Sequence, residues 1–294
     1  MQAHAGGASF EKTLTLGRQH YFVSQTETRR LLRDFGRDDD LSQMGFPDEY
    51  PHYAEPFWNL LGVRLIDSMD ASGFEGATIV HDLNTPLSAE YSGKYDAVCD
   101  VGTLEHVFNV PLAFANCMKA VRKGGRFFAF TPANNYFGHG FYQFSAEFFF
   151  SVFSEANGFR VNRVVACEYG LRRRWFCVSN PSEIRSRVSL INRHPVLLFI
   201  EATRIEEIEP FSSTPQQSDY MEMWGSDNMD GAGPRATGPT ARLKRFLLNN
   251  MPSLARSLEA VKTSWFDSRF SFGNRKLYSP VQKKSQSAQP RKTQ

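Results

Sequence analysis

Cysteine is scarce in this chain of 294 residues, which contains only four. Cys99, Cys117, Cys167 and Cys177 include no pair with CxxC spacing. The sequence therefore predicts neither a disulfide framework nor a zinc site of paired cysteines. Reduced, buried thiols in a cytoplasmic protein are the expectation.

Long apolar runs are missing as well. No run reaches the roughly 18 apolar residues needed to span a membrane, and residues 1–10 lack the charged and apolar segments of a signal peptide. The glycine motif GxGxxG is also absent, which disfavours a dehydrogenase that uses a nicotinamide dinucleotide.

Charge is divided unevenly, although the net charge is only +3. Residues 233–294 hold 13 Lys+Arg against two acids, a net of +11, so residues 1–232 carry a net of −8. The basic tail is a solvated segment, a contact with nucleic-acid phosphates, or a peripheral contact with anionic lipid at the inner face of the membrane. We favour lipid over nucleic acid, because a helix there would have an apolar face of Phe246, Leu247, Leu254 and Leu258.

Apolar segments with strand character alternate with segments of helical period over the first half of the chain. Strands are predicted at 12–16, 63–69, 77–80, 95–101 and 126–130, and helices at 24–33, 54–61, 103–122 and 145–157. Such alternation is typical of βαβ units. The later strands at 159–167, 175–178 and 195–201 have little helix between them, which indicates antiparallel pairing. We therefore predict an α/β, Rossmann-like, doubly wound and mostly parallel sheet with an antiparallel edge strand.

Composition divides the chain into four parts. Residues 1–11 are expected to be flexible, and 12–209 to form the α/β domain with an insertion at 34–61. Residues 210–240, rich in Ser, Pro, Gln and Gly, resemble a linker. A basic, helical or disordered extension is predicted at 241–294.

Three strand ends carry candidate ligand-binding residues, because an open parallel sheet binds ligands outside the carboxyl ends of its strands. Gly17 follows the first strand and allows close approach of backbone to a ligand. Asp70 ends the second strand, where a carboxylate can accept ribose hydroxyls, with Asp67 as a competitor. Asp82 and Leu83 follow the third strand and are candidates for adenine contact. An Asx-turn is the alternative for Asp82.

The segment from Tyr95 to Asn109 carries the densest chemistry. It brings Asp100, Gly102 and Thr103 to the end of a buried strand, followed by Glu105 and His106. His106 is a candidate general base, because its ordinary pKa is near neutral pH. The alternative makes Glu105 a first-turn helix acid and His106 a packed residue.

A loop at 131–143 follows the fifth strand. Glycines flank His139, which makes substrate contact or proton transfer a better interpretation than packing. No second His or acid stands at a recognisable metal-ligand spacing from it, so no metal site is predicted. Four polar residues could fix a polar substrate by hydrogen bonds: Asn134, Asn135, Tyr142 and Gln143.

Two stretches, YDAVCDVGTLEHVFNV and MKAVRKGGRFFAFTP, resemble the fourth strand, the following helix and the fifth strand of class I S-adenosylmethionine-dependent methyltransferases. PVLLFIEATRIE resembles the last strand of that fold, and the resemblance covers about residues 14–207. It implies that Gly17 begins the glycine loop and that Asp70 binds the ribose. Asp82 and Leu83 would then contact adenine, and Asp100 to Thr103 would line the methionine end.

The activity implied by this resemblance is methyl transfer from S-adenosylmethionine to a small polar or sugar-type acceptor. His106 or His139 would serve as base for a hydroxyl acceptor. The family's glycine-rich fingerprint is reduced here to Leu16-Gly17-Arg18-Gln19. A second hypothesis is therefore an inactive methyltransferase fold that serves as a binding or regulatory module.

Overall fold

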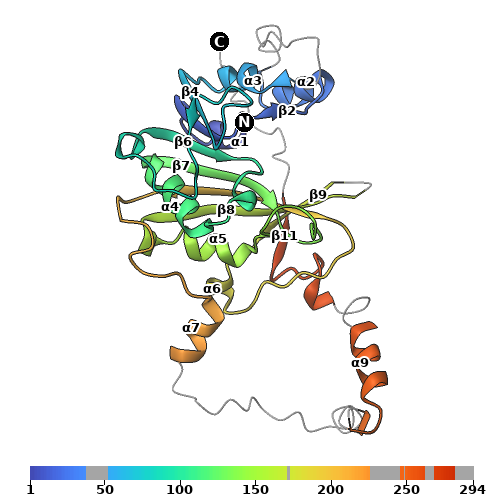
Figure 1. Ribbon diagram of the computed structural model, residues 1–294. Coiled ribbons are helices and arrows are strands. Elements are labelled where there is room, and N and C mark those ends of the chain that lie inside the picture. Colours follow the sequence, from blue (N-terminus) through green and yellow to red (C-terminus); the bar gives the residue numbers. More distant parts are fainter. Residues whose placement is uncertain (38–51, 171–172, 226–245, 248, 262–267, 282–294) are drawn as a thin grey trace, which may run out of the picture.

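The computed structural model describes residues 1–37, 52–170, 173–225, 246–247, 249–261 and 268–281. Its main feature is a nine-stranded sheet in the order β11-β9-β8-β10-β7-β6-β1-β4-β5 (Figure 1). The strands are β1 Lys12–Leu16, β4 Leu65–Asp70, β5 Ile79–Val80, β6 Tyr95–Asp100, β7 Val121–Pro132, β8 Phe159–Glu168, β9 Arg174–Val178, β10 Val196–Arg204 and β11 Tyr278–Pro280. A separate antiparallel pair joins β2 His20–Tyr21 and β3 His52–Tyr53.

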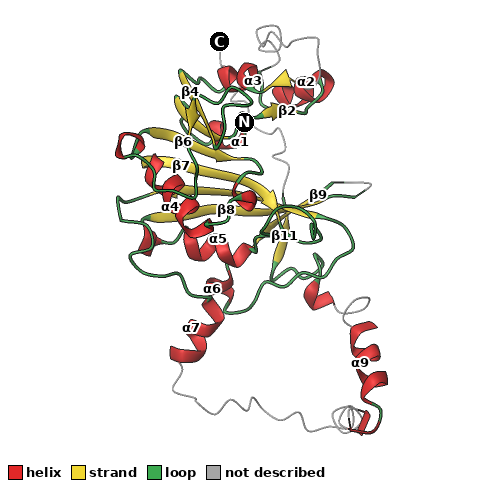
Figure 2. Cartoon of the chain, viewed as in Figure 1, coloured by secondary structure: helices red, strands yellow, loops and turns green. Residues whose placement is uncertain are grey.

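Helices stand between and beside these strands (Figure 2). They are α1 Gln2–Ala5, α2 Gln25–Asp34, α3 Glu55–Leu60, α4 Val110–Ala120, α5 Ala146–Val152, α6 Pro181–Ile184, α7 Ser218–Gly225 and α9 Pro252–Val261. Short 3-10 turns cover Ala89–Tyr91 (η2), Leu104–His106 (η3), Glu155–Asn157 (η4) and Ser268–Phe270 (η6). Among the described residues, no helix has the length and apolar character that crossing a membrane would require.

The strand order reverses between β1 and β6. From β1 the chain moves outward through β4 to β5 and then returns to β6 and β7 on the other side, with all five strands parallel. In the register, Leu16 pairs with Met69 on one side and with Asp100 on the other. The carboxyl ends of β1, β4 and β6 therefore form one rim, which is where doubly wound sheets bind ligands. The predicted Rossmann-like fold class is confirmed.

The antiparallel part is larger than the predicted edge strand. β10 lies between β7 and β8 and runs antiparallel to both, while β9 and β11 continue the sheet antiparallel to its edge. Val196, Leu198, Ile200 and Ala202 alternate along β10 and are all buried, so they line one face of the sheet, while Leu197 and Phe199 on the other face are half-buried. The insertion of β10 between β7 and β8 is a long-range pairing that the sequence pattern did not indicate.

Both faces of the sheet are covered. On one face α4 contacts β7 and α5 contacts β8, and Phe114 of α4 packs among the aromatic rings of Phe127, Phe144, Phe149 and Phe153. Because Phe114 is 1% exposed, truncating it to Ala would cost about 3–5 kcal/mol. On the other face the segment around Phe10 and Trp58 covers β6 and β7.

The starts of two helices agree with the sequence pattern, whereas the predicted helix over 103–122 does not. Ser24 and Glu27 form a capping box at the start of α2, as the spacing of a serine and a glutamate three residues apart allows, and Ser145 caps α5. The predicted helix over 103–122 is interrupted, because η3 ends at His106 and Pro111 helps to begin α4 afterwards. The helix also ends earlier than predicted, since α4 stops at Ala120 and β7 runs through Lys123–Gly125.

Two segments outside the predicted domain are ordered parts of the structure. Within the predicted linker 210–240, α7 forms, and Glu147 accepts hydrogen bonds from the amide (2.8 Å) and hydroxyl (3.1 Å) of Ser218. Within the predicted extension 241–294, β11 pairs with β9, and Phe272 stacks on Phe176 with ring centroids 4.3 Å apart. The division at 209 is therefore wrong for these segments, because Phe272, Leu277 and Tyr278 are buried in the core.

The prediction of a lipid contact by residues 241–294 concerns a segment that the structure describes only in part. The helix α9 carries Leu254, which is 43% exposed. Residues 240–245, 262–267 and 282–294 lie outside the described residues, so the lipid contact stays a prediction. The four cysteines are free, and Cys99, Cys117 and Cys167 are buried, which confirms the expected thiols.

Candidate functional site at the carboxyl rim

Gly17 stands at the point where β1, β4 and β6 end together. Its φ of +68° is in the left-handed region that favours glycine, and its N–H donates to the Met69 carbonyl oxygen at 2.7 Å. A Cβ atom on Gly17 would lie 3.7 Å from Asp70 Oδ2 and 3.5 Å from Thr103 Oγ1. Three residues predicted to bind the cofactor are thus neighbours, although they come from three different strands.

The end of β6 is fixed to this rim by hydrogen bonds. Thr103 Oγ1 donates to the Leu16 carbonyl oxygen at 3.0 Å and makes no side-chain cap on η3. Asp100 Oδ1 accepts from the amides of Thr103 (2.9 Å) and Leu104 (3.3 Å). Its Oδ2 is buried and has no hydrogen-bond partner among the described residues. Burial, reinforced by the charge of Glu105, raises the pKa of Asp100 to about 7.

The two carboxylates of β4 have different surroundings. Asp70 lies at the rim, where its Oδ1 accepts from the Ser72 amide at 2.9 Å. Asp67 Oδ2 instead accepts from Lys94 Nζ at 3.1 Å and from the Tyr95 hydroxyl at 2.8 Å, away from the strand end. Asp70 is therefore the carboxylate available to a ligand beside Gly17.

The residues after β5 fit the alternative interpretation better. Asp82 Oδ1 accepts from both the amide (2.9 Å) and the side-chain Nδ2 (2.8 Å) of Asn84, which is the Asx-turn, and these bonds lower the pKa of Asp82. Leu83 is 6% exposed and packs in the main core. The contact of Leu83 with an adenine ring stays a prediction.

Arg18 and Gln19 take up the space that a glycine-rich loop would leave open. Gln19 Nε2 donates to the carbonyl oxygens of Leu16 and Gly17. The Arg18 guanidinium lies 3.6 Å from the centre of the Tyr53 ring and donates from Nε to Glu55 at 2.7 Å. This turn leads into β2 and not directly into a helix.

A second cluster, made of Glu105, His106 and His139, lies beyond the end of β6. One carboxylate oxygen and one imidazole nitrogen from each histidine all lie within 4.8 Å of one another. Glu105 is fully buried, and its Oε2 accepts from Thr131 Oγ1 at 3.2 Å. Its Oε1 lies 3.4 Å from His139 Nε2 and has no hydrogen bond among the described residues.

The backbone explains why this cluster forms. The amides of Phe141 and Tyr142 donate to the Glu105 carbonyl oxygen at 2.8 and 3.1 Å, which draws the loop after β7 onto η3. Gly140 has φ +70°, and a Cβ there would lie only 2.8 Å from the same oxygen. Glu105 is therefore no surface helix acid, and His106 is exposed and not packed. Sequence spacing gives no sign of this cluster, because the fold brings together His106 and His139, which are 33 positions apart.

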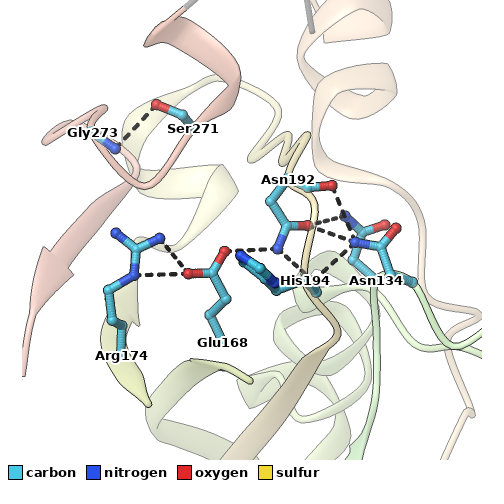
Figure 3. Close-up of polar contacts among 8 residues, drawn as sticks. Asn134, Glu168, Arg174, Asn192, His194, Ser271 and Gly273 are labelled. Carbon is cyan, nitrogen blue, oxygen red and sulfur yellow. Dashed lines mark hydrogen bonds and ion pairs between the residues drawn. The ribbon is translucent and has the colours of Figure 1, made fainter. Parts of the chain in front are cut away.

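The predicted substrate amides have structural partners. Asn134 and Asn135 both donate to Asn192 Oδ1, at 2.7 and 3.0 Å (Figure 3). Asn192 Nδ2 donates in turn to Glu168 Oε1 at 3.0 Å, and Glu168 is paired with Arg174. We call these five residues the asparagine clamp. It fixes the loop after β7 to the segment that enters β10, so Asn134 and Asn135 hold protein in place of the predicted substrate.

Of the other two predicted substrate residues, Tyr142 makes a hydrogen bond within the protein and Gln143 is exposed. The Tyr142 hydroxyl donates to the Phe108 carbonyl oxygen at 2.8 Å, whereas Gln143 is exposed beside a cavity of about 340 Å³.

Phenylalanine is exposed around the histidines, at 71% for Phe108, 98% for Phe137 and 69% for Phe141. Exposed aromatic side chains gathered at one rim are typical of a binding surface. On the other face, a largely apolar cavity of about 380 Å³ is bounded by Asp100, Val101 and Trp175.

Comparison with known proteins gives matches among solved structures only. No protein-family model matches the sequence, and the comparison with curated proteins gives no match. A Bacillus halodurans protein named as a methyltransferase shares 10% identity over 70% of this chain and 98% of its own, with a TM-score of 0.37. A Burkholderia thailandensis 1,6-didemethyltoxoflavin-N1-methyltransferase, with S-adenosylhomocysteine bound, shares 13% identity over 69% of this chain and 75% of its own, with a TM-score of 0.36.

A third structure is a 16S rRNA (adenine(1408)-N(1))-methyltransferase from Catenulisporales acidiphilia. It shares 12% identity over 70% of this chain and 90% of its own, with a TM-score of 0.35. At such identities and TM-scores the likeness supports no conclusion about activity. The function has therefore to be inferred from the residues of the rim.

Proposed function

We propose that the rim formed by β1, β4 and β6 binds S-adenosylmethionine and that the protein transfers its methyl group to an acceptor held near His139. The observation that supports this most is the approach of Gly17, Asp70 and Thr103 at the reversal of strand order. A glycine, a carboxylate and a hydroxyl at that point suit a nucleoside whose ribose is held by Asp70.

The same turn argues against a nucleotide with phosphates. Phosphate groups are usually held at a helix N-terminus directly after the first strand. Here Gly17 is followed by β2, and α2 begins only at Gln25, with its N-terminus capped by Ser24. S-adenosylmethionine has an adenosine and an amino acid but no phosphate, so it needs no such helix.

Each rim residue has a role in this proposal. Gly17 allows the backbone to approach the ligand, and Asp70 accepts hydrogen bonds from the ribose hydroxyls. Asp82 remains the candidate for the adenine amino group, through the oxygen that does not bind Asn84. Asp100, Gly102 and Thr103 line the methionine end, where Gly102 with φ +89° keeps the turn open.

The chemistry is an in-line displacement in which positioning of donor and acceptor dominates. A lone pair of the acceptor oxygen or nitrogen forms a bond to the methyl carbon while the carbon–sulfur bond breaks. The sulfur keeps that electron pair, and the product is S-adenosylhomocysteine. The acceptor proton passes to the imidazole of His139 or His106, and the buried Glu105 carboxylate stabilises the His139 cation that forms.

The acceptor is a small molecule in this proposal, with a hydroxyl or amine beside an apolar surface. Asn134 and Asn135, two of the four residues expected to bind a polar acceptor, have side-chain amides that belong to the asparagine clamp. Phe108, Phe137 and Phe141 offer exposed aromatic surface next to His139. Such surface binds apolar or aromatic groups better than a purely polar sugar.

Calorimetric titration with S-adenosylhomocysteine tests the proposal on the full chain. We expect one saturable site, with NAD⁺ as a control that gives no heat because the phosphate site is missing. No heat at millimolar S-adenosylhomocysteine would favour the inactive module. If binding is found, turnover of S-adenosylmethionine with panels of phenols, amines and sugars identifies the acceptor class.

A further inference from the structure

We propose that Glu105, His106 and His139 form a binding site for one divalent transition-metal ion. The proposal goes beyond methyl transfer and does not depend on it, because metal binding is measured without the methyl donor. Its basis is the position of one carboxylate oxygen and two imidazole nitrogens within 4.8 Å of one another. These residues come from η3 and from the loop after β7, which the backbone of Gly140 to Tyr142 fixes against Glu105.

Glu105 has the features of a prepared ligand. Its side chain is fully buried, and Thr131 Oγ1 holds Oε2 at 3.2 Å from the side away from the histidines. That leaves Oε1, which has no hydrogen bond among the described residues, facing His139. A buried carboxylate oxygen without a hydrogen bond is costly unless a cation compensates it. A neighbouring group that orients a ligand from behind is typical of metal sites.

The two imidazoles can complete the coordination without a change in the backbone. Tetrahedral coordination at ordinary bond lengths places ligand atoms about 3.3–3.5 Å apart. The Glu105–His139 separation of 3.4 Å already fits that value. The side chain of His139 is 49% exposed and His106 is also exposed, so rotation of either ring can close the wider separations of up to 4.8 Å.

The ligand set indicates which ions would bind. Two nitrogens and one carboxylate oxygen suit Zn²⁺, Co²⁺, Fe²⁺ or Ni²⁺, whereas Mg²⁺ and Ca²⁺ prefer oxygen ligands alone. Three protein ligands leave at least one position open, as in catalytic zinc sites. An acceptor hydroxyl bound at that position would lose its proton more readily. With the ion bound, the histidines act as ligands and the proton goes to solvent.

The alternative is the metal-free state used in the proposed function, in which Glu105 orients His139 as a base. To separate the two, the full-length protein is stripped with EDTA and titrated with ZnCl₂ by calorimetry. A parallel titration with CoCl₂ is followed by the visible absorption of coordinated Co²⁺. The variants are His139→Ala and Glu105→Gln. The matched control is His194→Ala, whose exposed ring lies outside the cluster while only its backbone carbonyl contacts the asparagine clamp.

We expect one Zn²⁺ per wild-type chain, with binding retained in His194→Ala and lost in His139→Ala. Thr131→Val, which removes only the group behind the carboxylate, should weaken binding about 10- to 100-fold. Thermal unfolding shows whether Glu105→Gln folds. If it does not, His139→Ala still decides the question, because His139 is half exposed and its replacement should leave the fold intact. Equal Zn²⁺ binding by wild type and His139→Ala, or none by wild type, overturns the proposal. S-adenosylhomocysteine binding, measured in EDTA, reports on the proposed function separately.

Discussion

Thr103 Oγ1 donates a hydrogen bond of 3.0 Å to the carbonyl oxygen of Leu16, a residue 87 positions earlier in the chain. The bond crosses the place where the strand order reverses, and it joins the turn after β6 to the last residue of β1. Because Gly17 follows Leu16 directly, the position of Thr103 controls the width of the rim beside Asp70.

Removing that hydroxyl is expected to loosen the rim. Thr103→Ala should lower the free energy of unfolding by about 1 kcal/mol, since the Leu16 carbonyl oxygen loses a donor. It should also weaken S-adenosylhomocysteine binding. Thr103→Ser keeps the donor and should remain close to wild type. Denaturant unfolding and calorimetry check both values, and identical behaviour of the Ala and Ser variants would contradict the role given to the hydroxyl.

The buried Asp100 predicts a specific pH dependence of stability. Its folded pKa of about 7 lies above the ordinary value of 3.8, so the fold favours the protonated form. The unfolded chain ionises freely, and stability is therefore lost progressively as pH rises from about 4 to about 7. Three pKa units correspond to at most about 4 kcal/mol.

Asp100→Asn removes this ionisation while keeping an oxygen for the amides of Thr103 and Leu104. We expect the variant to be more stable than wild type at pH 8, with most of that advantage gone at pH 4.5. Denaturant unfolding in EDTA at the two pH values measures the difference. An advantage of equal size at both would show that Asp100 is not ionising in this range.

The asparagine clamp should control the order of the loop after β7. Asn192→Ala leaves Asn134, Asn135 and Glu168 without their shared partner, at a cost of about 1–3 kcal/mol. Asn162→Ala is the matched control, because its partner Thr203 is at the surface and such changes cost under about 0.5 kcal/mol.

Hydrogen exchange tests where the effect of Asn192→Ala appears. The amides of residues 133–143 should exchange faster, while those of α4 should not change. Uniformly faster exchange across both segments would mean that the clamp stabilises the whole domain and not the loop in particular.

Replacing Arg18 with lysine is expected to lower the stability of the protein. Its guanidinium combines stacking on Tyr53 with the hydrogen bond to Glu55, and an ammonium group cannot do both. Both side chains of the ion pair are about a third exposed, so Arg18→Lys and Arg18→Ala should each cost no more than about 1 kcal/mol. Thermal unfolding measures the stability of both variants. If Arg18→Lys were as stable as wild type, the stacking of Arg18 on Tyr53 would contribute nothing to stability.

The parallel half of the sheet was predictable because its signals are local. β1 spans the predicted residues, and the ends of β4 and β6 fall within one residue of their predicted ends. Strand ends in a parallel sheet meet at one edge, so Gly17, Asp70 and Asp100 could be assigned to a common rim before their contacts were known. The capping box of Ser24 and Glu27 likewise depends on residues three positions apart.

What escaped prediction depends on contacts between distant residues. The approach of His139 to Glu105 arises from backbone hydrogen bonds that leave no periodic signal. The partner of Asn134 is 58 positions away, and the pairing of β11 with β9 spans a basic segment that resembles a tail.

The most direct test compares Asp70→Asn with Asp67→Asn by S-adenosylhomocysteine titration, since the same substitution is made three residues apart on β4. Asp70→Asn should weaken binding roughly 10- to 100-fold at unchanged stability, because a charged acceptor for the ribose is lost. Asp67→Asn should lower stability through Lys94 and Tyr95 and leave the affinity unchanged. If Asp70→Asn bound as tightly as wild type, no nucleoside would be held at this rim in the way described.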